Sequence, residues 1–415
     1  MAAFAYRCTA CGRSYERDEV RYLCPECGRA YRPGIPLCGV LAAEFDADKI
    51  ARRFRKSDPD WGLFCAVEPR YFPPYPMGWT PFFRAEALGR AARLPNTWVK
   101  NDALNPSGSL KDRASFLVAA EACRLGEGTI VAASTGNAAS SLAAVCAAAG
   151  RRAVIFVPRS APRAKLAQML LHGASVVPVA GTYDDAFRLS LEYTARYGGL
   201  NRNTAYHPLT IEGKKTVGLE IWMQNKWRAP SVVLVPTGDG VILAGVAKAF
   251  EDLLAARLIP ELPRLVCVQA ERSDAIHRYI ETGKYRAARN PSTIADSISV
   301  SVPANAHLAR AAVMRSGGAS LTVSDREIME GQRVLAAVSG VFAEPAAAAA
   351  AAGLLKLRGR GLAGPADQVV VLVTGHGLKD IDAALRGLKI PEAIEPTEEG
   401  LETAAKRLRK MGVGR

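Results

Sequence analysis

The sequence predicts an α/β protein in which parallel sheets are flanked by helices. Short apolar runs that predict strands alternate with longer stretches of helical periodicity from about residue 79 onward. Several of these strands lead through a glycine-bearing turn directly into a helix. At 415 residues, the chain has room for two to three domains with a large buried core. This alternation builds parallel sheets, whose ligands collect at the carboxyl ends of the strands.

The first segment predicts a separate metal-binding module. Cys8 and Cys11 form one Cys-x-x-Cys pair, and Cys24 and Cys27 form a second pair after twelve intervening residues. This spacing fits a tetrahedral site of four thiolates. Two disulfides or free thiols are the alternatives. The scatter of the other cysteines and a first segment unlike a signal peptide disfavour both. We therefore expect a zinc ribbon with a structural role.

Residues 105–113, which read NPSGSLKDR, place a lysine at the start of a predicted helix. An apolar-periodic run begins at Leu110, so Lys111 falls in the first helical turn. The positive end of the helix dipole disfavours an ammonium there and lowers the pKa of the lysine. A lysine held in this way is suited to forming a Schiff base. The alternative is an ordinary loop-to-helix junction with a solvated Lys-Asp-Arg triplet.

Glycine-bearing loops follow three of the predicted strands. A turn of this kind at a helix N-terminus presents free N–H groups and the positive dipole end, which together bind phosphate or carboxylate. The loops are residues 134–137 after Thr129–Ala133, residues 237–240 after Val232–Pro236, and residues 374–380 after Val369–Val373. Further strands are predicted at residues 153–157, Ser175–Val179, 265–269 and 321–323.

Together these motifs resemble the threonine synthases, a family of pyridoxal-phosphate enzymes with the tryptophan-synthase-β fold type. The resemblance covers about residues 78–388 and implies a two-lobed fold of type II. Its most specific motifs are NPSGSLKDR and VTGHGLKD, whereas the strand–glycine loops are shared across the fold type. The motifs are NPSGSLKDR (105–113), ASTGN (133–137), IEGKKT (211–216), PTGDG (236–240), EPA (344–346) and VTGHGLKD (373–380).

The resemblance also implies roles for individual residues. Lys111 would carry pyridoxal phosphate as a Schiff base and act as the acid and base of the reaction. Asn137 would hydrogen-bond the phenolic oxygen of the ring, and Thr374 would offer its hydroxyl to the pyridine nitrogen. The substrate carboxylate would bind Ser134, Thr135 and Gly136. The cofactor phosphate would be wrapped by Gly238, Asp239, Gly240, Val241 and Ile242.

Three of these residues have simpler interpretations. Asn137 could only cap the following helix, and Thr374 could be a strand-end threonine without a ligand. The carboxylate of Asp239 would repel a phosphate. We therefore expect its side chain to point along the turn and cap the next helix while backbone amides bind the anion.

The sequence departs from the family where a substrate phosphate would bind. His207 replaces the asparagine that usually precedes the proline, and no arginine lies between Asn203 and Gly213. Losing a guanidinium at an anion site is a substantial change. His207 and Lys214 or Lys215 could supply replacement positive charge. The alternative for the two lysines is a solvated surface position.

The resemblance implies the conversion of O-phospho-L-homoserine and water to L-threonine and phosphate by β,γ-replacement. One alternative is another amino-acid enzyme of the same fold, such as a threonine or serine dehydratase or a cysteate or cysteine synthase. A second alternative is a non-catalytic zinc-ribbon protein that binds nucleic acid. The net charge of +14 invites that interpretation. However, the basic residues are spread along the chain, so we expect no nucleic-acid partner.

The same observations predict a cytoplasmic homodimer that acts on a small amino acid, with no apolar run suited to a membrane. The expected domains are a zinc ribbon at 1–36, a linker or N-terminal extension at 37–78, a large cofactor-binding domain at 79–103 and 204–391, a small domain at 104–203, and a C-terminal tail at 392–415.

Overall fold

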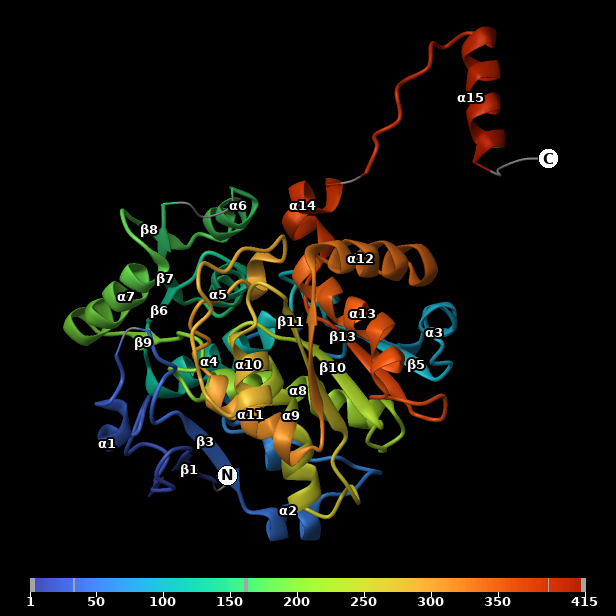
Figure 1. Ribbon diagram of the computed structural model, residues 1–415. Coiled ribbons are helices and arrows are strands. Elements are labelled where there is room, and N and C mark those ends of the chain that lie inside the picture. Colours follow the sequence, from blue (N-terminus) through green and yellow to red (C-terminus); the bar gives the residue numbers. More distant parts are fainter. Residues whose placement is uncertain (1–3, 33, 160–162, 387, 412–415) are drawn as a thin grey trace.

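Across the residues that the structure describes, the chain forms three sheets surrounded by helices (Figure 1). The computed structural model describes residues 4–32, 34–159, 163–386 and 388–411. Within these residues, no helix combines the length and the apolar character needed to cross a bilayer. The predicted α/β architecture, with parallel sheets and flanking helices, is confirmed.

The largest sheet has six strands in the order β12-β11-β10-β13-β5-β4. All neighbours are parallel except β4, which pairs antiparallel with β5. Its strands are β4 (Phe82–Arg84), β5 (Thr97–Asn101), β10 (Val232–Pro236), β11 (Arg264–Ala270), β12 (Ala319–Val323) and β13 (Val369–Val373).

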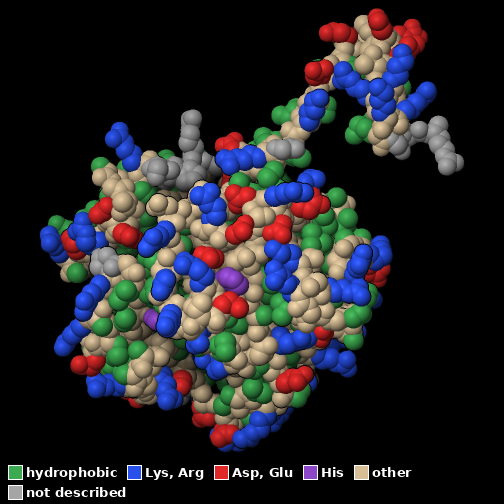
Figure 2. Space-filling view, viewed as in Figure 1, with side chains coloured by type: hydrophobic (Ala, Val, Ile, Leu, Met, Phe, Trp, Pro, Cys, Tyr) green, Lys and Arg blue, Asp and Glu red, His purple; other side chains and the backbone are tan. Residues whose placement is uncertain are grey.

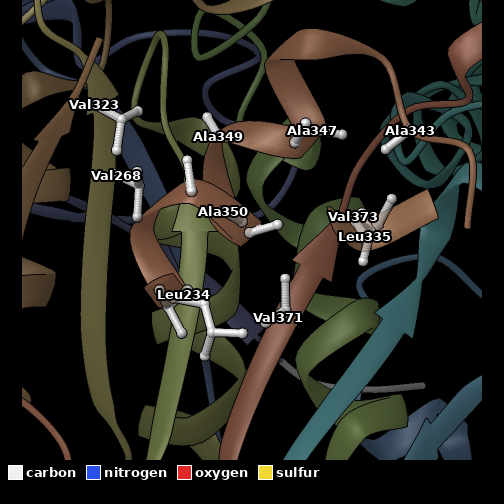
Figure 3. Packing of buried hydrophobic residues seen from close by; sticks show 14 of the residues in the cluster. Leu234, Val268, Val323, Leu335, Ala343, Ala347, Ala349, Ala350, Val371 and Val373 are labelled. Carbon is white, nitrogen blue, oxygen red and sulfur yellow. The ribbon is translucent and has the colours of Figure 1, made fainter. Parts of the chain in front are cut away.

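Residues of β10 alternate between two cores on opposite faces of this sheet. Val232 and Leu234 face a core built with α3, α12 and α13, whereas Val233 and Val235 face a core built with α8, α9 and α11. Both faces are therefore buried, as expected for a parallel sheet. Figure 3 shows the alanines of α13 packing against valines and leucines of the strands.

The second sheet has four parallel strands in the order β8-β7-β6-β9. Helices α4 and α5 contribute to the core on one face, and α7 covers the other. The strands are β6 (Thr129–Ala133), β7 (Arg152–Pro158), β8 (Ser175–Val179) and β9 (Leu200–Asn201).

The N-terminal segment forms a small antiparallel sheet, β2-β1-β3. Its strands are β1 (Phe4–Cys8), β2 (Ser14–Tyr15) and β3 (Leu41–Phe45), with the short helix α1 (Pro25–Gly28) between the last two. The boundary expected at residue 36 falls inside this module, because β3 pairs with β1 along its whole length.

The remaining helices connect and cover these sheets. They are α2 (Ala47–Arg53), α3 (Glu86–Ala92), α4 (Lys111–Leu125), α5 (Asn137–Ala148), α6 (Arg163–Leu171), α7 (Tyr183–Tyr197), α8 (Leu209–Gln224), α9 (Val241–Ala255), α10 (Ala275–Thr282), α11 (Ala306–Arg315), α12 (Asp325–Ser339), α13 (Pro345–Leu357), α14 (Ile381–Leu385) and α15 (Glu398–Lys410). Short 3-10 turns lie at Trp61–Phe64, Pro69–Tyr71, Asp102–Leu104, Asp296–Ile298, Arg358–Arg360 and Gly377–Asp380.

Two features of the molecular surface concern the last helix and the distribution of charged side chains. Helix α15 projects from the body at the end of an extended segment (Figure 1). On the face drawn in Figure 2, Lys and Arg side chains are dispersed among Asp and Glu and do not form a single basic stripe.

Candidate active site

Lys111 is the first residue of α4, at the end of a loop that is held by the next residue in the chain. The carboxylate of Asp112 accepts a hydrogen bond from the backbone N–H of Ser107 at 2.8 Å and from the hydroxyl of Tyr75 at 3.0 Å. The Ser107 hydroxyl also donates to it. Asp112 and Arg113 are fully buried. The alternative of a solvated Lys-Asp-Arg triplet is therefore wrong.

The loop before Lys111 lies against the loop that follows β13. Leu110 N donates to the Thr374 carbonyl at 2.9 Å, and His376 N donates to the Gly108 carbonyl at 2.9 Å. The ammonium of Lys379 donates to the carbonyl of Ser107 at 2.8 Å. These contacts join the two most specific sequence motifs into one side of a pocket.

One cavity brings together all eight residues that the resemblance assigned to the cofactor. The eight residues that line it are Lys111, Asn137, Gly238, Asp239, Gly240, Val241, Ile242 and Thr374. Lys111 is half-buried, whereas Asn137 and Thr374 are buried.

Residues 237–240 form the loop between β10 and α9. Gly240 has a φ of +85°, a left-handed conformation that favours glycine. A Cβ atom on this residue would also lie 2.8 Å from the Cβ of Ala309. The first N–H groups of α9 have no partner within the helix and carry the positive dipole end, which suits a phosphate.

The sequence predicted that the side chain of Asp239 caps α9, and this prediction is wrong. The residue before the first turn is Gly240, and no side chain caps this helix end. Instead, Asp239 lines the cavity beside Lys111. Its negative charge raises the pKa of Lys111 and opposes the larger effect of burial.

Asn137 and Glu344 form a buried pair on the cavity wall. The amide Nδ2 of Asn137 donates to Oε1 of Glu344 at 2.8 Å, whereas its Oδ1 has no partner within the described residues. Burial raises the pKa of Glu344, although the charge of Lys165 and the bond from Asn137 lower it. Glu344 is the first residue of the EPA motif that contributes to the resemblance, but no role was predicted for its side chain.

Two buried basic residues, Arg202 and Lys214, affect Lys111 or are affected by it, and of these only Lys214 was considered from the sequence. Burial lowers the pKa of Lys111, and the charge of Arg202 lowers it further. Lys214 is fully buried, and its Nζ has no hydrogen-bond partner among the described residues. Burial and the charge of Lys111 hold the pKa of Lys214 well below its usual value. Lys214 stands between Gly213 and Lys215, and this local sequence gives no signal of such burial.

A second, larger cavity opens beside the first and shares Lys111, Asn137 and Asp239 with it. Ser134, Thr135 and Gly136, which were predicted to bind the substrate carboxylate, line this second cavity. Gly136 N donates to the Ser134 hydroxyl at 3.1 Å, which fixes the turn. We call this second space the substrate cavity.

His207 lies apart from both cavities. It is absent from the described residues that line them, and its ring meets Tyr22 edge to face at 5.7 Å. Burial lowers the pKa of His207 to about 4, so the ring is neutral at pH 7 and cannot supply positive charge.

The two neighbouring lysines of α8 are buried as well. The Nζ atom of Lys215 lies 3.1 Å from Oδ2 of Asp252. Because Lys214 and Lys215 are both buried, the alternative of a solvated surface position is wrong for each.

The four N-terminal cysteines converge as predicted. The sulfur atoms of Cys8, Cys11, Cys24 and Cys27 all lie within 4.8 Å of one another, and no disulfide joins them. This cluster could hold a metal ion.

The first cavity suits the cofactor that the resemblance implies. It contains a half-buried amine, an orphaned amide oxygen on Asn137, a strand-end hydroxyl on Thr374 and a helix N-terminus for a phosphate. These groups match an aldehyde, a phenolic hydroxyl that donates to the amide oxygen, a ring nitrogen and a phosphate, respectively.

Comparisons with known proteins identify the family and the relatives of this chain. A family model described as pyridoxal-phosphate dependent enzyme matches residues 74–375. The chain is 34% identical to the threonine synthase of Methanocaldococcus jannaschii, over 97% of this chain and 99% of that protein. It is 31% identical to the threonine synthase of Methanosarcina acetivorans, over 96% and 98% of the two chains. Among solved structures, maize serine racemase shares the fold, with a TM-score of 0.63 and 19% identity over 80% of this chain and 93% of the racemase.

Proposed function

We propose that this chain, which belongs to the pyridoxal-phosphate dependent enzymes and within them to the threonine synthase family, converts O-phospho-L-homoserine and water to L-threonine and phosphate. The proposal is carried by one observation: a lysine in the first turn of α4 shares a cavity with the α9 loop, Asn137 and Thr374. Likeness to full-length threonine synthases selects this reaction from those that such a cavity could support.

We assign the cofactor contacts to the residues that line the first cavity. Bound pyridoxal phosphate supplies an aldehyde for Lys111 and the substrate amine, together with a ring that accepts electrons from the substrate carbons. The amides at the start of α9 would hold the phosphate. The neutral hydroxyl of Thr374 would donate a hydrogen bond to the ring nitrogen and would not keep that nitrogen protonated, which moderates the electron sink.

We assign Lys111 as the acid and base of the reaction. Its lowered pKa increases the neutral fraction of the amine, so it can remove the proton at Cα and later return one. In the overall replacement, Cβ loses one proton, the bond between Cγ and the phosphate oxygen breaks, and Cγ gains one proton. Water supplies the hydroxyl at Cβ, and its second proton goes to the released phosphate.

The substrate carboxylate is assigned to Ser134, Thr135 and Gly136 on the wall of the substrate cavity. We assign the attraction of the substrate phosphate to the positive charge of the buried Arg202, which also lowers the pKa of Lys111. His207 is neutral at pH 7, and burial lowers the pKa of Lys214, so neither is assigned this role.

Phosphate release tests the proposal against its nearest alternative. Purified protein loaded with pyridoxal phosphate is given O-phospho-L-homoserine and, separately, L-threonine. We expect stoichiometric phosphate and threonine from the first and little 2-oxobutyrate from the second. Rapid 2-oxobutyrate formation without phosphate release would identify a dehydratase instead.

We also propose that the cysteine cluster binds one Zn²⁺ ion. A tetrahedral ion with Zn–S bonds of about 2.3 Å separates its sulfur atoms by about 3.8 Å. The four sulfurs here lie within 4.8 Å of one another, which suits such an ion. Metal analysis should find one zinc per chain in the wild type and none in Cys24→Ser. The homodimer and the cytoplasmic location stay predictions from the sequence.

A further inference from the structure

One loop connects the cysteine cluster to the substrate cavity. We define the ribbon loop as residues 29–32 and 34–38, which follow the second cysteine pair. Tyr31, Gly34, Ile35 and Leu37 of this loop line the substrate cavity, which Lys111 also lines. A segment of the metal-binding module is therefore a wall of the space assigned to the amino-acid substrate.

Both ends of the ribbon loop are fastened to the second cysteine pair. At its start, Ala30 N donates to the carbonyl of Cys27 at 3.1 Å. At its end, Cys24 N donates to the Gly39 carbonyl at 2.8 Å. Gly39 passes so close that a Cβ atom on it would lie 2.9 Å from the Cβ of Cys27 and 3.1 Å from that of Cys24. The ribbon loop therefore begins at the second cysteine pair and ends in contact with the same pair.

Leu37 of the ribbon loop contacts residues that line both cavities. Leu37 N donates to the Ala304 carbonyl at 3.0 Å, and Ala304 lines the substrate cavity. The side chain of Leu37 is buried in a small cluster with Val241, the first residue of α9. Ile35 is 38% exposed although it is large and apolar, because it faces the open cavity.

No disulfide holds the two cysteine pairs together, so their cross-link depends on a bound ion. We propose that the metal ion shapes the substrate cavity: it fixes the base of the ribbon loop, and the loop then forms the cavity wall. Metal loss releases this wall and weakens substrate binding. Cofactor binding persists, because the eight residues assigned to the cofactor lie outside the loop. This inference rests on the proposed function only in taking the second cavity as the substrate site.

Three variants test the inference. Cys27→Ser removes a ligand at the loop base, and Ile35→Ala trims the wall but keeps all four cysteines. Cys123→Ser, which changes another partly exposed free cysteine on α4, is the matched control. Each protein is measured for bound zinc, hydrogen exchange of the ribbon loop, affinity for pyridoxal phosphate, and KM and kcat for O-phospho-L-homoserine.

We expect Cys27→Ser to lose zinc, to exchange its loop amides faster and to raise KM about tenfold or more, with cofactor affinity within about twofold of the wild type. Ile35→Ala should raise KM with zinc retained, and the control should match the wild type. If Cys27→Ser does not fold, wild-type protein stripped of metal with a chelator and a reductant gives the same comparison. Unchanged loop exchange and KM after metal loss would overturn the inference, as would a parallel loss of cofactor affinity.

The exchange measurement separates this inference from the proposed function. If wild-type protein releases no phosphate from O-phospho-L-homoserine, the proposed function fails. Loop exchange with and without zinc, and the spectral change of the bound cofactor on adding L-threonine, still decide whether metal controls the wall.

Discussion

At the residue scale, burial lowers the pKa of Lys111, and the positive charge of Arg202 adds to that effect while Asp239 and Glu344 oppose it. A neutral amine is the form that attacks an aldehyde. The sequence predicted the direction of this shift from the helix dipole alone. Its main cause is the enclosure of the side chain, which depends on segments far away in the chain.

Lys111→Ala should reduce turnover by at least about 10²-fold to 10⁴-fold, the usual contribution of a positioned acid or base. Borohydride reduction should fix pyridoxal phosphate covalently to the wild type but not to the variant. Lys389→Ala, which changes an exposed lysine, is the control and should keep both properties. Ordinary turnover by Lys111→Ala would remove Lys111 from the mechanism.

Lys214→Met should stabilise the protein without cofactor. The buried Lys214 ammonium has no hydrogen-bond partner within the described part of the chain, so folding favours its neutral form. Between its folded pKa and 10.5, the unfolded chain binds more protons, so this group makes the free energy of unfolding of the wild type rise with pH. The slope from one such group is at most about 1.4 kcal/mol per pH unit.

Methionine keeps the length of the side chain and removes the ionisable group. The variant should therefore unfold at a higher urea concentration at pH 7 and lose this part of the pH slope. Urea titrations at pH 6 to 10 measure both quantities. An unchanged slope would mean that Lys214 is charged and has an anionic partner in the folded protein.

The sequence identified those site residues that belong to a recognisable local motif. It did not identify residues that approach Lys111 only because distant segments fold together. Lys111, Asn137 and Thr374 were found because each follows a recognisable turn or strand end. Glu344 and Arg202 were missed because only the fold brings them to the pocket.

At the scale of elements, β5 lies inside the large sheet, between β13 and the edge strand β4, although its sequence does not predict a buried strand. Lys100 in β5 is fully buried and donates to Oε2 of Glu220 at 2.6 Å and to the carbonyl of Thr80 at 2.8 Å. Polar residues normally signal an exposed strand. By contrast, the all-apolar β10 and β13 were predicted with their observed bounds.

Glu220 connects three elements through buried ion pairs. On α8, it accepts from Lys100 of β5 and from Arg113 of α4, whose Nη1 lies 2.7 Å from Oε1. Glu220→Gln should cost about 3–5 kcal/mol of unfolding free energy, because it leaves buried cations without their partner. Glu86→Gln is the control and should change it by less than about 0.5 kcal/mol, since its pairs are exposed.

The same residue predicts a pH dependence. Burial alone would raise the pKa of Glu220, but Arg113 and Lys100 outweigh it and lower the pKa to about 2. Its stabilising effect is therefore complete above the unfolded pKa of 4.5 and is lost as the pH falls toward 2. Thermal unfolding of the wild type and of Glu220→Gln between pH 6 and pH 3 should converge at the acid end. Parallel curves would contradict this assignment.

At the scale of the whole molecule, the sequence predicted the alternation of strands and helices but not how the parts meet. The cavities lie where loops of both parallel sheets approach each other, and the N-terminal module adds a wall. Nothing in the cysteine spacing indicates that the segment after it reaches Lys111. Such long-range contacts depend on the packing of β1 and β3 against α4.

Helix α15 should contribute little to the stability of the body from which it projects (Figure 1). Its apolar side chains Leu401 and Leu408 are 67% and 45% exposed, and an interaction of Arg407 with Glu392 stays within the C-terminal segment. Removing residues 391–415 should therefore change the free energy of unfolding of the isolated chain by less than about 0.5 kcal/mol and leave KM unchanged. Urea unfolding at several protein concentrations measures this. A truncated protein that loses stability only at high concentration, where copies associate, would show that α15 packs against a second copy of the chain.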